Sequence, residues 1–198
     1  MSKVDNMITN REQLEQILKN ERKVYLGRER IRLEDKFRKS LKYEIYRYIA
    51  QLRKYEYLCY QRDYSKSSVF SKIWSLRVKK CDRKKNKLGA ILGIEITPYF
   101  MGNGVRICHQ NVIINGTVGD NCVLHGHNVI GNKKTGAKQE VPKIGRNVDI
   151  GIGAIVIGDI EIADGCIIGA GSVVTKSFLT PGTVIVGVPA REIRPKKD

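Results

Sequence analysis

Aliphatic residues recur every six positions through the second half of the chain, and this repeat is the clearest pattern in the sequence. Neither the 3.6-residue period of an amphipathic helix nor the two-residue period of an ordinary strand keeps a strict six. A fixed period indicates stacked units that bury one face against their neighbours. The hexads predict a parallel β-helix with three short strands and about 18 residues in each coil. Nine aliphatic residues open the hexads: Val118, Leu124, Ile130, Ile144, Ile150, Val156, Ile162, Ile168 and Val174.

The repeat is interrupted between Ile130 and Ile144, which lie 14 positions apart. Because 14 is not a multiple of six, segment 131–143 must contain a looped-out insertion, and insertions in solenoids lie in loops on one face. Upstream, GIEITP, GVRICHQ and NVIINGT predict short strands in a less regular first coil. Residues 180–198 contain prolines and lose the repeat, as a capping segment does. We therefore predict a β-helix domain over residues 89–198, with a loop at 131–143 and a cap at 180–198.

Residues 1–88 show helical spacing instead. The segment Thr9–Glu12 predicts a capping box at the start of a first helix. A second, longer amphipathic helix is predicted by apolar residues at intervals of three and four, and we expect this stripe to make subunit contacts. A polar break at 63–68 separates it from a shorter helix that carries Val69, Ile73, Trp74 and Leu76 and ends in a basic run. The stripe consists of Phe37, Leu41, Ile45, Tyr48, Leu52, Tyr55 and Cys59.

The positive charge of the chain is concentrated in this helical region. The net charge is +16; residues 1–90 hold 25 Lys and Arg against 11 Asp and Glu, whereas residues 91–198 hold 11 against 9. This asymmetry indicates attraction to an anionic partner. Nucleic acid is not the expected partner, since no RNP, KH, helix-turn-helix or zinc-ligand spacing accompanies the basic and aromatic residues. Solvated helix faces, an anionic polymer and the anionic inner membrane surface remain as alternatives.

The sequence also bears on localisation. It has no run of 18 apolar residues, and its first residues lack the apolar segment of a signal peptide. Five scattered cysteines without a CxxC pair are typical of reduced thiols. We therefore expect a cytoplasmic protein, with peripheral membrane association as an added role of the basic helices.

All three histidines fall on the repeat: His109, His125 and His127. His109 and His127 are 18 positions apart, so in a regular coil their side chains stack. Glu95 lies 14 positions before His109, on the preceding coil, and a histidine with a carboxylate partner suits general-base catalysis. For His125 and His127, a surface or hydrogen-bonded core position is an equal alternative. No metal site is expected, because two histidines at i and i+2 lack the offset that zinc requires.

At these residues the sequence resembles the hexapeptide-repeat acyltransferases, and in particular their serine acetyltransferase branch. The similarity covers residues 89–198 and rests on GIEITP, VRICHQ, VPKIG, IGIGAIVIGDI, IGAGSVV and GVPARE. It implies a left-handed parallel β-helix, acetyl-CoA as the co-substrate without a metal, and a homotrimer, with pairing of trimers into hexamers left open.

The resemblance also assigns roles to residues. His109 matches the catalytic histidine, and Glu95 matches the acidic residue that orients it. Apart from the resemblance, we assign His127 an accessory role at the oxyanion. Segment 131–143 matches the loop that closes over the site. Six positions are assigned to cofactor binding: Gly131, Ala154, Ala170, Lys176, Arg191 and Arg194.

Two departures from the serine acetyltransferase pattern concern the acceptor. Cys108 precedes His109 where the family has Asp, and Glu140-Val141 stands where the family has Arg-His. The groups that grip serine are thus missing, and a carboxylate prefers a bidentate cation. The basic helical region resembles versions found in capsule and exopolysaccharide proteins.

We therefore predict an O-acetyltransferase that moves acetyl from acetyl-CoA to a sugar hydroxyl of a bacterial surface polysaccharide. Transfer is direct, with His109 as the base and Cys108 facing the core. Three alternatives stay open: a serine O-acetyltransferase of cysteine biosynthesis, a sugar-nucleotide N-acyltransferase, and a non-enzymatic scaffold that binds polyanions.

Overall fold

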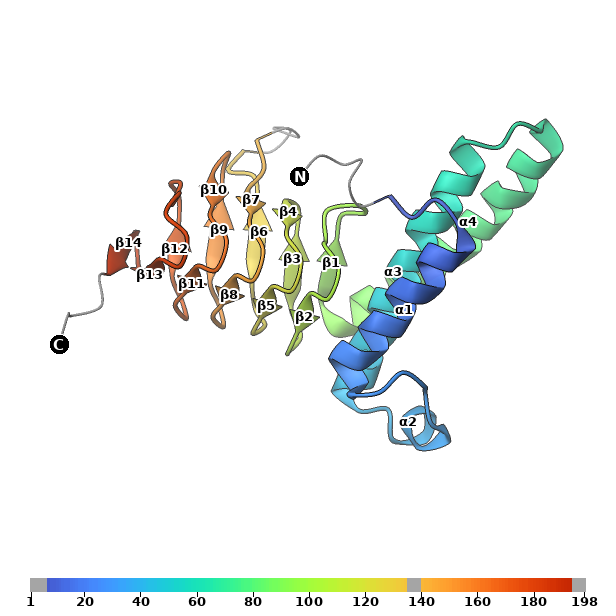
Figure 1. The fold of residues 1–198 in the computed structure, drawn as a ribbon, viewed down its shortest axis with the longest axis horizontal. Helices are drawn as coiled ribbons and strands as arrows, with labels where there is room; N and C mark the ends of the chain where they lie inside the picture. Colours follow the sequence, from blue (N-terminus) through green and yellow to red (C-terminus); the bar gives the residue numbers. More distant parts are fainter. Residues whose placement is uncertain (1–6, 135–139, 194–198) are drawn as a thin grey trace. The chain divides into compact units, whose positions relative to one another are not determined.

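A computed structural model describes residues 7–134 and 140–193, and the chain divides into two compact units, Met1–Ile94 and Glu95–Asp198. Figure 1 shows that helices form the first unit and that short strands form the second. The helices are α1 (Arg11–Leu26), α2 (Leu33–Arg38), α3 (Leu41–Asp63) and α4 (Ser68–Leu92).

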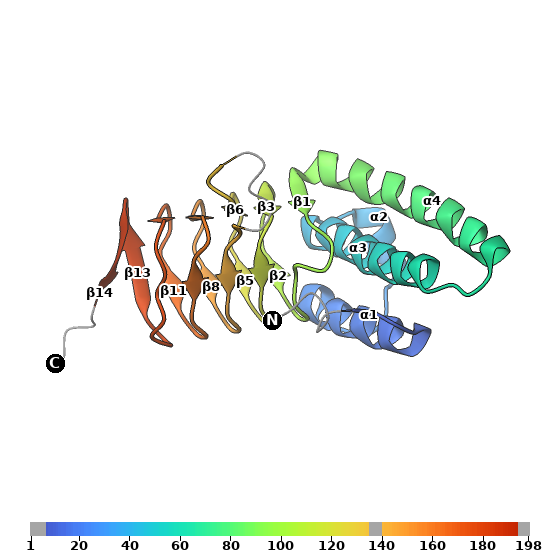
Figure 2. The same cartoon turned by 90° about the horizontal axis from the view of Figure 1, so that it is seen from above.

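Helix α3 is the centre of the helical unit and packs against both α1 and α4 (Figure 2). Its predicted apolar stripe is confirmed as core: Ile45, Tyr48, Leu52 and Cys59 are at most 6% exposed. Phe37 does not belong to the stripe, because it lies in α2 with 82% of its surface exposed. Since the stripe is already covered by α1 and α4, it is not available for the subunit contacts expected of it.

Local side-chain contacts fix where the helices begin. The N-cap of α1 is Asn10, whose Oδ1 accepts the backbone N–H of Gln13 at 2.9 Å. The cap therefore lies one residue later than the predicted Thr9, whose own N–H donates to the Gln13 side chain. The sequence signal for a helix start was right, but a Thr-Asn pair offers two cap residues and the spacing alone does not choose between them.

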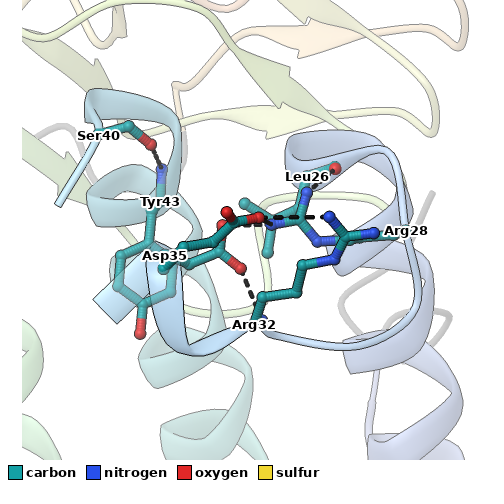
Figure 3. Close-up of polar contacts among 7 residues, drawn as sticks. Leu26, Arg28, Arg32, Asp35, Ser40 and Tyr43 are labelled. Carbon is teal, nitrogen blue, oxygen red and sulfur yellow. Dashed lines mark hydrogen bonds and ion pairs between the residues drawn. The ribbon is translucent and has the colours of Figure 1, made fainter. Parts of the chain in front are cut away.

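Polar contacts also order the connection from α1 through α2 to α3 (Figure 3). Asp35 accepts the backbone N–H of Arg32 at 2.8 Å and pairs with the Arg28 guanidinium. These two donors lower the pKa of the Asp35 carboxyl. Ser40 then caps α3 by accepting the N–H of Tyr43 at 3.4 Å.

A buried ion cluster joins α1 to α3. Arg53 donates to Glu21 at 3.2 Å and to Glu56 at 3.3 Å, and all three side chains are at most 2% exposed. Among the described residues, Arg53 pairs with both carboxylates, and the Oε2 atom of Glu21 has no hydrogen-bond partner. Burial therefore raises the pKa of Glu21 in spite of the neighbouring guanidinium.

The second unit is built from parallel strands arranged in three sheets, with one antiparallel pair, β13–β14, at the C-terminal end. The strand bounds, sheet by sheet, are β1 (Ile94–Ile96), β3 (Val112–Ile114), β6 (Val129–Gly131), β9 (Ile155–Ile157) and β12 (Val173–Val174); β4 (Thr117–Val118), β7 (Lys143–Ile144) and β10 (Glu161–Ile162); and β2 (Arg106–Ile107), β5 (Val123–Leu124), β8 (Asp149–Ile150), β11 (Ile167–Ile168), β13 (Val184–Gly187) and β14 (Ala190–Ile193).

The nine hexad-opening residues form the core of this unit, as predicted: each is at most 4% exposed. Successive coils align them directly, so that Leu124, Ile150 and Ile168 occupy matching positions on neighbouring strands. The hexapeptide-repeat fold with parallel strands and an N-terminal helical region is thereby confirmed.

The coils differ in length. Ile168 pairs with Ile150, 18 positions earlier, but Ile150 pairs with Leu124 26 positions earlier, and Leu124 pairs with Ile107 17 positions earlier. The long coil contains the predicted insertion, between the end of β6 at Gly131 and the start of β7 at Lys143. The short coil precedes it, and it changes which residues meet around His109.

Candidate active site

His109 lies just after β2, exposed in the turn that leads to β3. Since Ile107 pairs with Leu124, the residue opposite His109 on the next coil is Gly126. A Cβ on Gly126 would lie 2.5 Å from the Cβ of His109, and the φ angle of Gly126 is +107°. Only glycine fits both the backbone angle and the close approach. The sequence analysis did not identify Gly126. The 17 positions between Ile107 and Leu124, which open neighbouring coils, could have shown that Gly126 lies opposite His109.

The expected stacking of His109 beneath His127 is wrong. The coil between β2 and β5 is 17 residues long rather than 18, because Ile107 pairs with Leu124. After the next turn the offset between the two coils falls to 16 residues, because Ile113 pairs with Val129. The neighbour of His127 is therefore Asn111, whose Nδ2 lies 3.5 Å from the His127 Nδ1. His127 has a φ of +55° and Asn111 a φ of +60°. His127 thus occupies a left-handed turn position, where glycine, asparagine and histidine are favoured.

Glu95 lies on β1 with its side chain exposed. Thr97 donates its N–H to the carbonyl of Ile114, which aligns Glu95 with Ile113, four residues beyond His109. Within residues 7–134 and 140–193, no hydrogen bond or ion pair joins Glu95 to His109. The role of Glu95 as the orienting carboxylate stays a prediction.

The structure instead gives a carboxylate partner to His125. Nε2 of His125 lies 2.8 Å from Oδ1 of Asp149, and the two side chains are 44% and 49% exposed. His125 stands on the coil next to His109, aligned with Cys108. Sequence reasoning left His125 without a role, because the aspartate that meets it is 24 positions away.

Cys108 does not face the core as expected. Val105 and Ile107 fill the core at this point, and Cys108 is half-buried at the end of the strand, where its N–H donates to the carbonyl of Leu124. All five cysteines are free. Burial raises the pKa of the Cys122 thiol to about 11, which makes it a poor nucleophile.

Ala170 belongs to the same corner of the coil stack as His109. The strand register continued by two residues places His109, Gly126, Ile152 and Ala170 one above the other. The hydrogen bonds from Gly153 to Gly126 and from Gly171 to Ile152 follow this alignment. Three coil steps separate His109 from Ala170, or about 14 Å at the usual spacing of parallel strands.

The other predicted cofactor positions are more scattered. Ala154 is fully buried, and its N–H already donates to the carbonyl of Gly151. Gly131 ends β6, at the start of the insertion. Lys176 is exposed, with its ammonium 5.4 Å from the centre of the Phe178 ring, and Arg191 lies exposed on β14. Arg194 lies outside the described residues.

The described part of the chain contains no group of three or more histidine, cysteine, aspartate or glutamate side chains that could hold a metal ion. It also contains no helix that is both long and apolar enough to cross a membrane.

Comparisons with known proteins show which proteins this chain resembles. Residues 142–176 match the family model described as bacterial transferase hexapeptide (six repeats). The serine acetyltransferase of Buchnera aphidicola subsp. Schizaphis graminum is 33% identical over 119 residues, which cover 58% of this chain and 45% of the relative. That of Escherichia coli strain K12 is 34% identical over 120 residues, which cover 58% and 43%. The chain thus spans less than half the length of these curated relatives.

Solved structures show the same fold. Serine acetyltransferase from Brucella abortus strain S19 in complex with coenzyme A has a TM-score of 0.69 and 23% identity, and covers 96% of this chain and 72% of that one. The Neisseria gonorrhoeae enzyme has a TM-score of 0.65 and 22% identity, and covers 93% and 68%.

These findings overturn the predicted polysaccharide acceptor. The relatives named above are serine acetyltransferases, and they do not support a capsule or exopolysaccharide branch. The prediction rested on the basic helical region and on substitutions at three positions, Cys108, Glu140 and Val141. The similarity to serine acetyltransferases extends over more than half of the chain and outweighs them.

Proposed function

We propose that this protein is an acetyl-CoA-dependent O-acetyltransferase whose acceptor is L-serine. The observation that carries the proposal is the similarity to serine acetyltransferases over the unit that contains His109, with His109 exposed at the turn after β2. A histidine in this position can reach a hydroxyl and remove its proton.

In the proposed reaction, His109 takes the proton of the serine hydroxyl as the oxygen attacks the thioester carbonyl. The tetrahedral oxyanion then collapses, the carbon–sulfur bond breaks, and the coenzyme A thiolate leaves and accepts the proton held by the His109 imidazolium. The acetyl group passes directly to serine, and no acyl-enzyme forms. Glu95 is proposed to stabilise the imidazolium of His109 in the bound state, since a carboxylate favours the protonated ring.

The corner from His109 to Ala170 supports a binding path for the donor. Gly126 and Ala170 are small, so a pantetheine arm can approach the backbone at both positions and lie against the exposed side chain of Ile152 between them. The exposed cations Lys176 and Arg191, farther along the stack, suit the phosphates of coenzyme A. We propose a left-handed winding and a homotrimer on the resemblance alone.

The test is acetyl transfer by the full-length protein, with release of coenzyme A thiol as the readout and with L-serine, a monosaccharide and an oligosaccharide as acceptors. We expect saturable transfer to serine, and a loss of about 10²- to 10⁴-fold in kcat for His109→Ala with an unchanged circular dichroism spectrum. No transfer to serine, or full activity in His109→Ala, would refute the proposal.

A second proposed role concerns the outer face of α4: we propose that it docks on an anionic lipid membrane. Its first half presents bulky apolar side chains, which helices of globular proteins usually bury against a neighbouring element. Instead, Val69, Ile73 and Leu76 are 64%, 45% and 69% exposed, and the neighbouring Phe70 is 60% exposed. We call these four residues the α4 apolar face. Continuing at intervals of three and four, the same side of the helix then carries exposed Lys80, Arg83, Lys84 and Lys87.

This arrangement favours a membrane over two other partners. A second copy would bring two units of net charge +14 together, which like-charge repulsion opposes. A nucleic acid would satisfy the cations but not the apolar residues. An anionic lipid surface attracts the lysines and arginines, by about 1 kcal/mol each, and receives the apolar side chains at its interface.

Co-sedimentation with vesicles of phosphatidylcholine, with or without phosphatidylglycerol, tests this role. We expect binding only with phosphatidylglycerol, weakened by salt and by Phe70→Ser with Leu76→Ser, but not by Leu179→Ser, which removes an equally exposed leucine from the β unit. Three results would overturn it: binding without anionic lipid, full binding by the Phe70→Ser, Leu76→Ser variant, or a fall in molecular mass in that variant, which would identify the face as a contact between copies.

A further inference from the structure

Among the ion pairs between coils in the described residues, His125–Asp149 is the one that stands beside the proposed catalytic histidine. His125 aligns with Cys108, the residue before His109, and its own successor Gly126 lies against His109. One strand spacing and one residue separate the backbones of His125 and His109, or about 6 Å. Both side chains leave the coil stack on its solvent side.

The contact with Asp149 determines what His125 offers a ligand. An ionised carboxylate only accepts hydrogen bonds, so Nε2 of His125 carries the proton and donates it to Oδ1 over 2.8 Å. In the neutral ring, Nδ1 then has a free lone pair. In that neutral state the pair as a whole carries the negative charge of Asp149, so the pair accepts from a cation only while His125 is unprotonated. A group that accepts hydrogen bonds within a net negative pair is complementary to a primary ammonium group.

We propose that His125, held by Asp149, binds the ammonium group of the acceptor while His109 takes the proton of its hydroxyl. This inference rests on the proposed function and names a residue that selects the acceptor. In serine the ammonium and the hydroxyl are on adjacent carbon atoms, so one molecule can reach two imidazoles on neighbouring coils. Asp149 is a positioning residue, because it acts through His125.

The experiment compares kcat and KM for L-serine, for L-glycerate, which lacks the ammonium group, and for acetyl-CoA. The wild type should prefer serine to glycerate. His125→Ala should raise the KM for serine by about 10- to 100-fold, the worth of a hydrogen bond to a charged group, and leave kcat and the KM for acetyl-CoA nearly unchanged. It should also remove the preference for serine over glycerate. Asp149→Asn can still accept the Nε2 proton but lacks the charge, so its KM for serine should rise less.

The matched control is Asp164→Asn. Asp164 pairs with Arg146 of the neighbouring coil at 2.9 Å, and its side chain is about as exposed as that of Asp149. It lies outside the proposed site. If His125–Asp149 were only a surface pair of this kind, His125→Ala would change the melting temperature as little as Asp164→Asn does and leave the KM for serine unaltered. That result would overturn the inference, and so would a loss in kcat with an unchanged KM. His109→Ala, assayed in parallel, separates the two proposals: serine transfer that survives His109→Ala refutes the proposed function, whereas normal serine binding by His125→Ala refutes only this inference.

Discussion

Replacing Gly126 with alanine tests the register around His109 most directly. The new Cβ would lie 2.5 Å from the Cβ of His109 and 3.2 Å from its Cα and carbonyl carbon. Carbon atoms rest at about 3.5–4.0 Å, so His109 must retreat by roughly 1 Å. A displacement of that size in a catalytic group costs about 10²-fold in rate. The φ of +107° adds strain of about 1–3 kcal/mol in the folded state.

The assay for Gly126→Ala is kcat for serine acetylation together with thermal unfolding. Gly182→Ala is the matched control: its φ of +72° also opposes a side chain, but apart from its chain neighbours no described residue has an atom within 4 Å of the new Cβ. We expect both variants to melt earlier and only Gly126→Ala to lose activity. Adding Gly126→Ala to His109→Ala should cost no further activity, because both changes act on the same imidazole. Wild-type kcat in Gly126→Ala would show that His109 does not depend on this contact, and would refute the reasoning.

Three further predictions concern stability. Arg53→Met leaves two buried carboxylates without the cation between them and should destabilise the helical unit by about 3–5 kcal/mol, measured by urea unfolding with the fluorescence of Trp74, the chain's one tryptophan. Burial raises the pKa of Glu21, so its contribution to stability is complete below the pKa of the unfolded chain, about 4.3, and is lost as the pH rises through the pKa in the folded protein. In the same urea assay, Glu21→Gln should make the free energy of unfolding depend less on pH. The backbone N–H and guanidinium of Arg146 lower the pKa of Asp164, so this pair stabilises the β unit above pH about 3.9, and that stabilisation is lost on acidification. The melting temperature of Asp164→Asn should therefore fall less on acidification than that of the wild type.

The core of the β unit could be predicted from sequence because it depends on a local repeat. Each hexad places one aliphatic residue inward, and neighbouring coils bring these residues together whatever the turns do. Ile150 and Ile168 therefore pair as predicted. Turn length is different, since a left-handed residue such as Asn111 or Asn121 lets a turn close with fewer residues. One missing residue in the coil before Leu124 was enough to put Gly126, rather than His127, against His109.

The helical unit shows a second limit of pattern reading. Spacing identifies the residues that share a helix face, but it does not say whether another element covers that face. The stripe on α3 and the α4 apolar face have the same spacing; α1 and α4 bury the first, and the described residues leave the second exposed. The sequence therefore indicated which residues share each face, but not which of the two faces another element covers.

The acceptor prediction failed because it looked for the groups that bind the acceptor only at the positions that the family pattern fills. Glu140 and Val141 replace the cation and imidazole expected at the end of the loop, and that loss suggested a different acceptor. In a coil stack, however, the residues around His109 come from neighbouring coils: Gly126 from the next, and Asp149, through His125, from the one after. Polar groups that the loop lacks can thus come from residues 16 to 40 positions after His109 in sequence, and the lengths of the coils determine which residues these are. For this fold, the choice of acceptor has to be argued from the register of the coils, and the serine and glycerate kinetics of His125→Ala are the measurement that decides it.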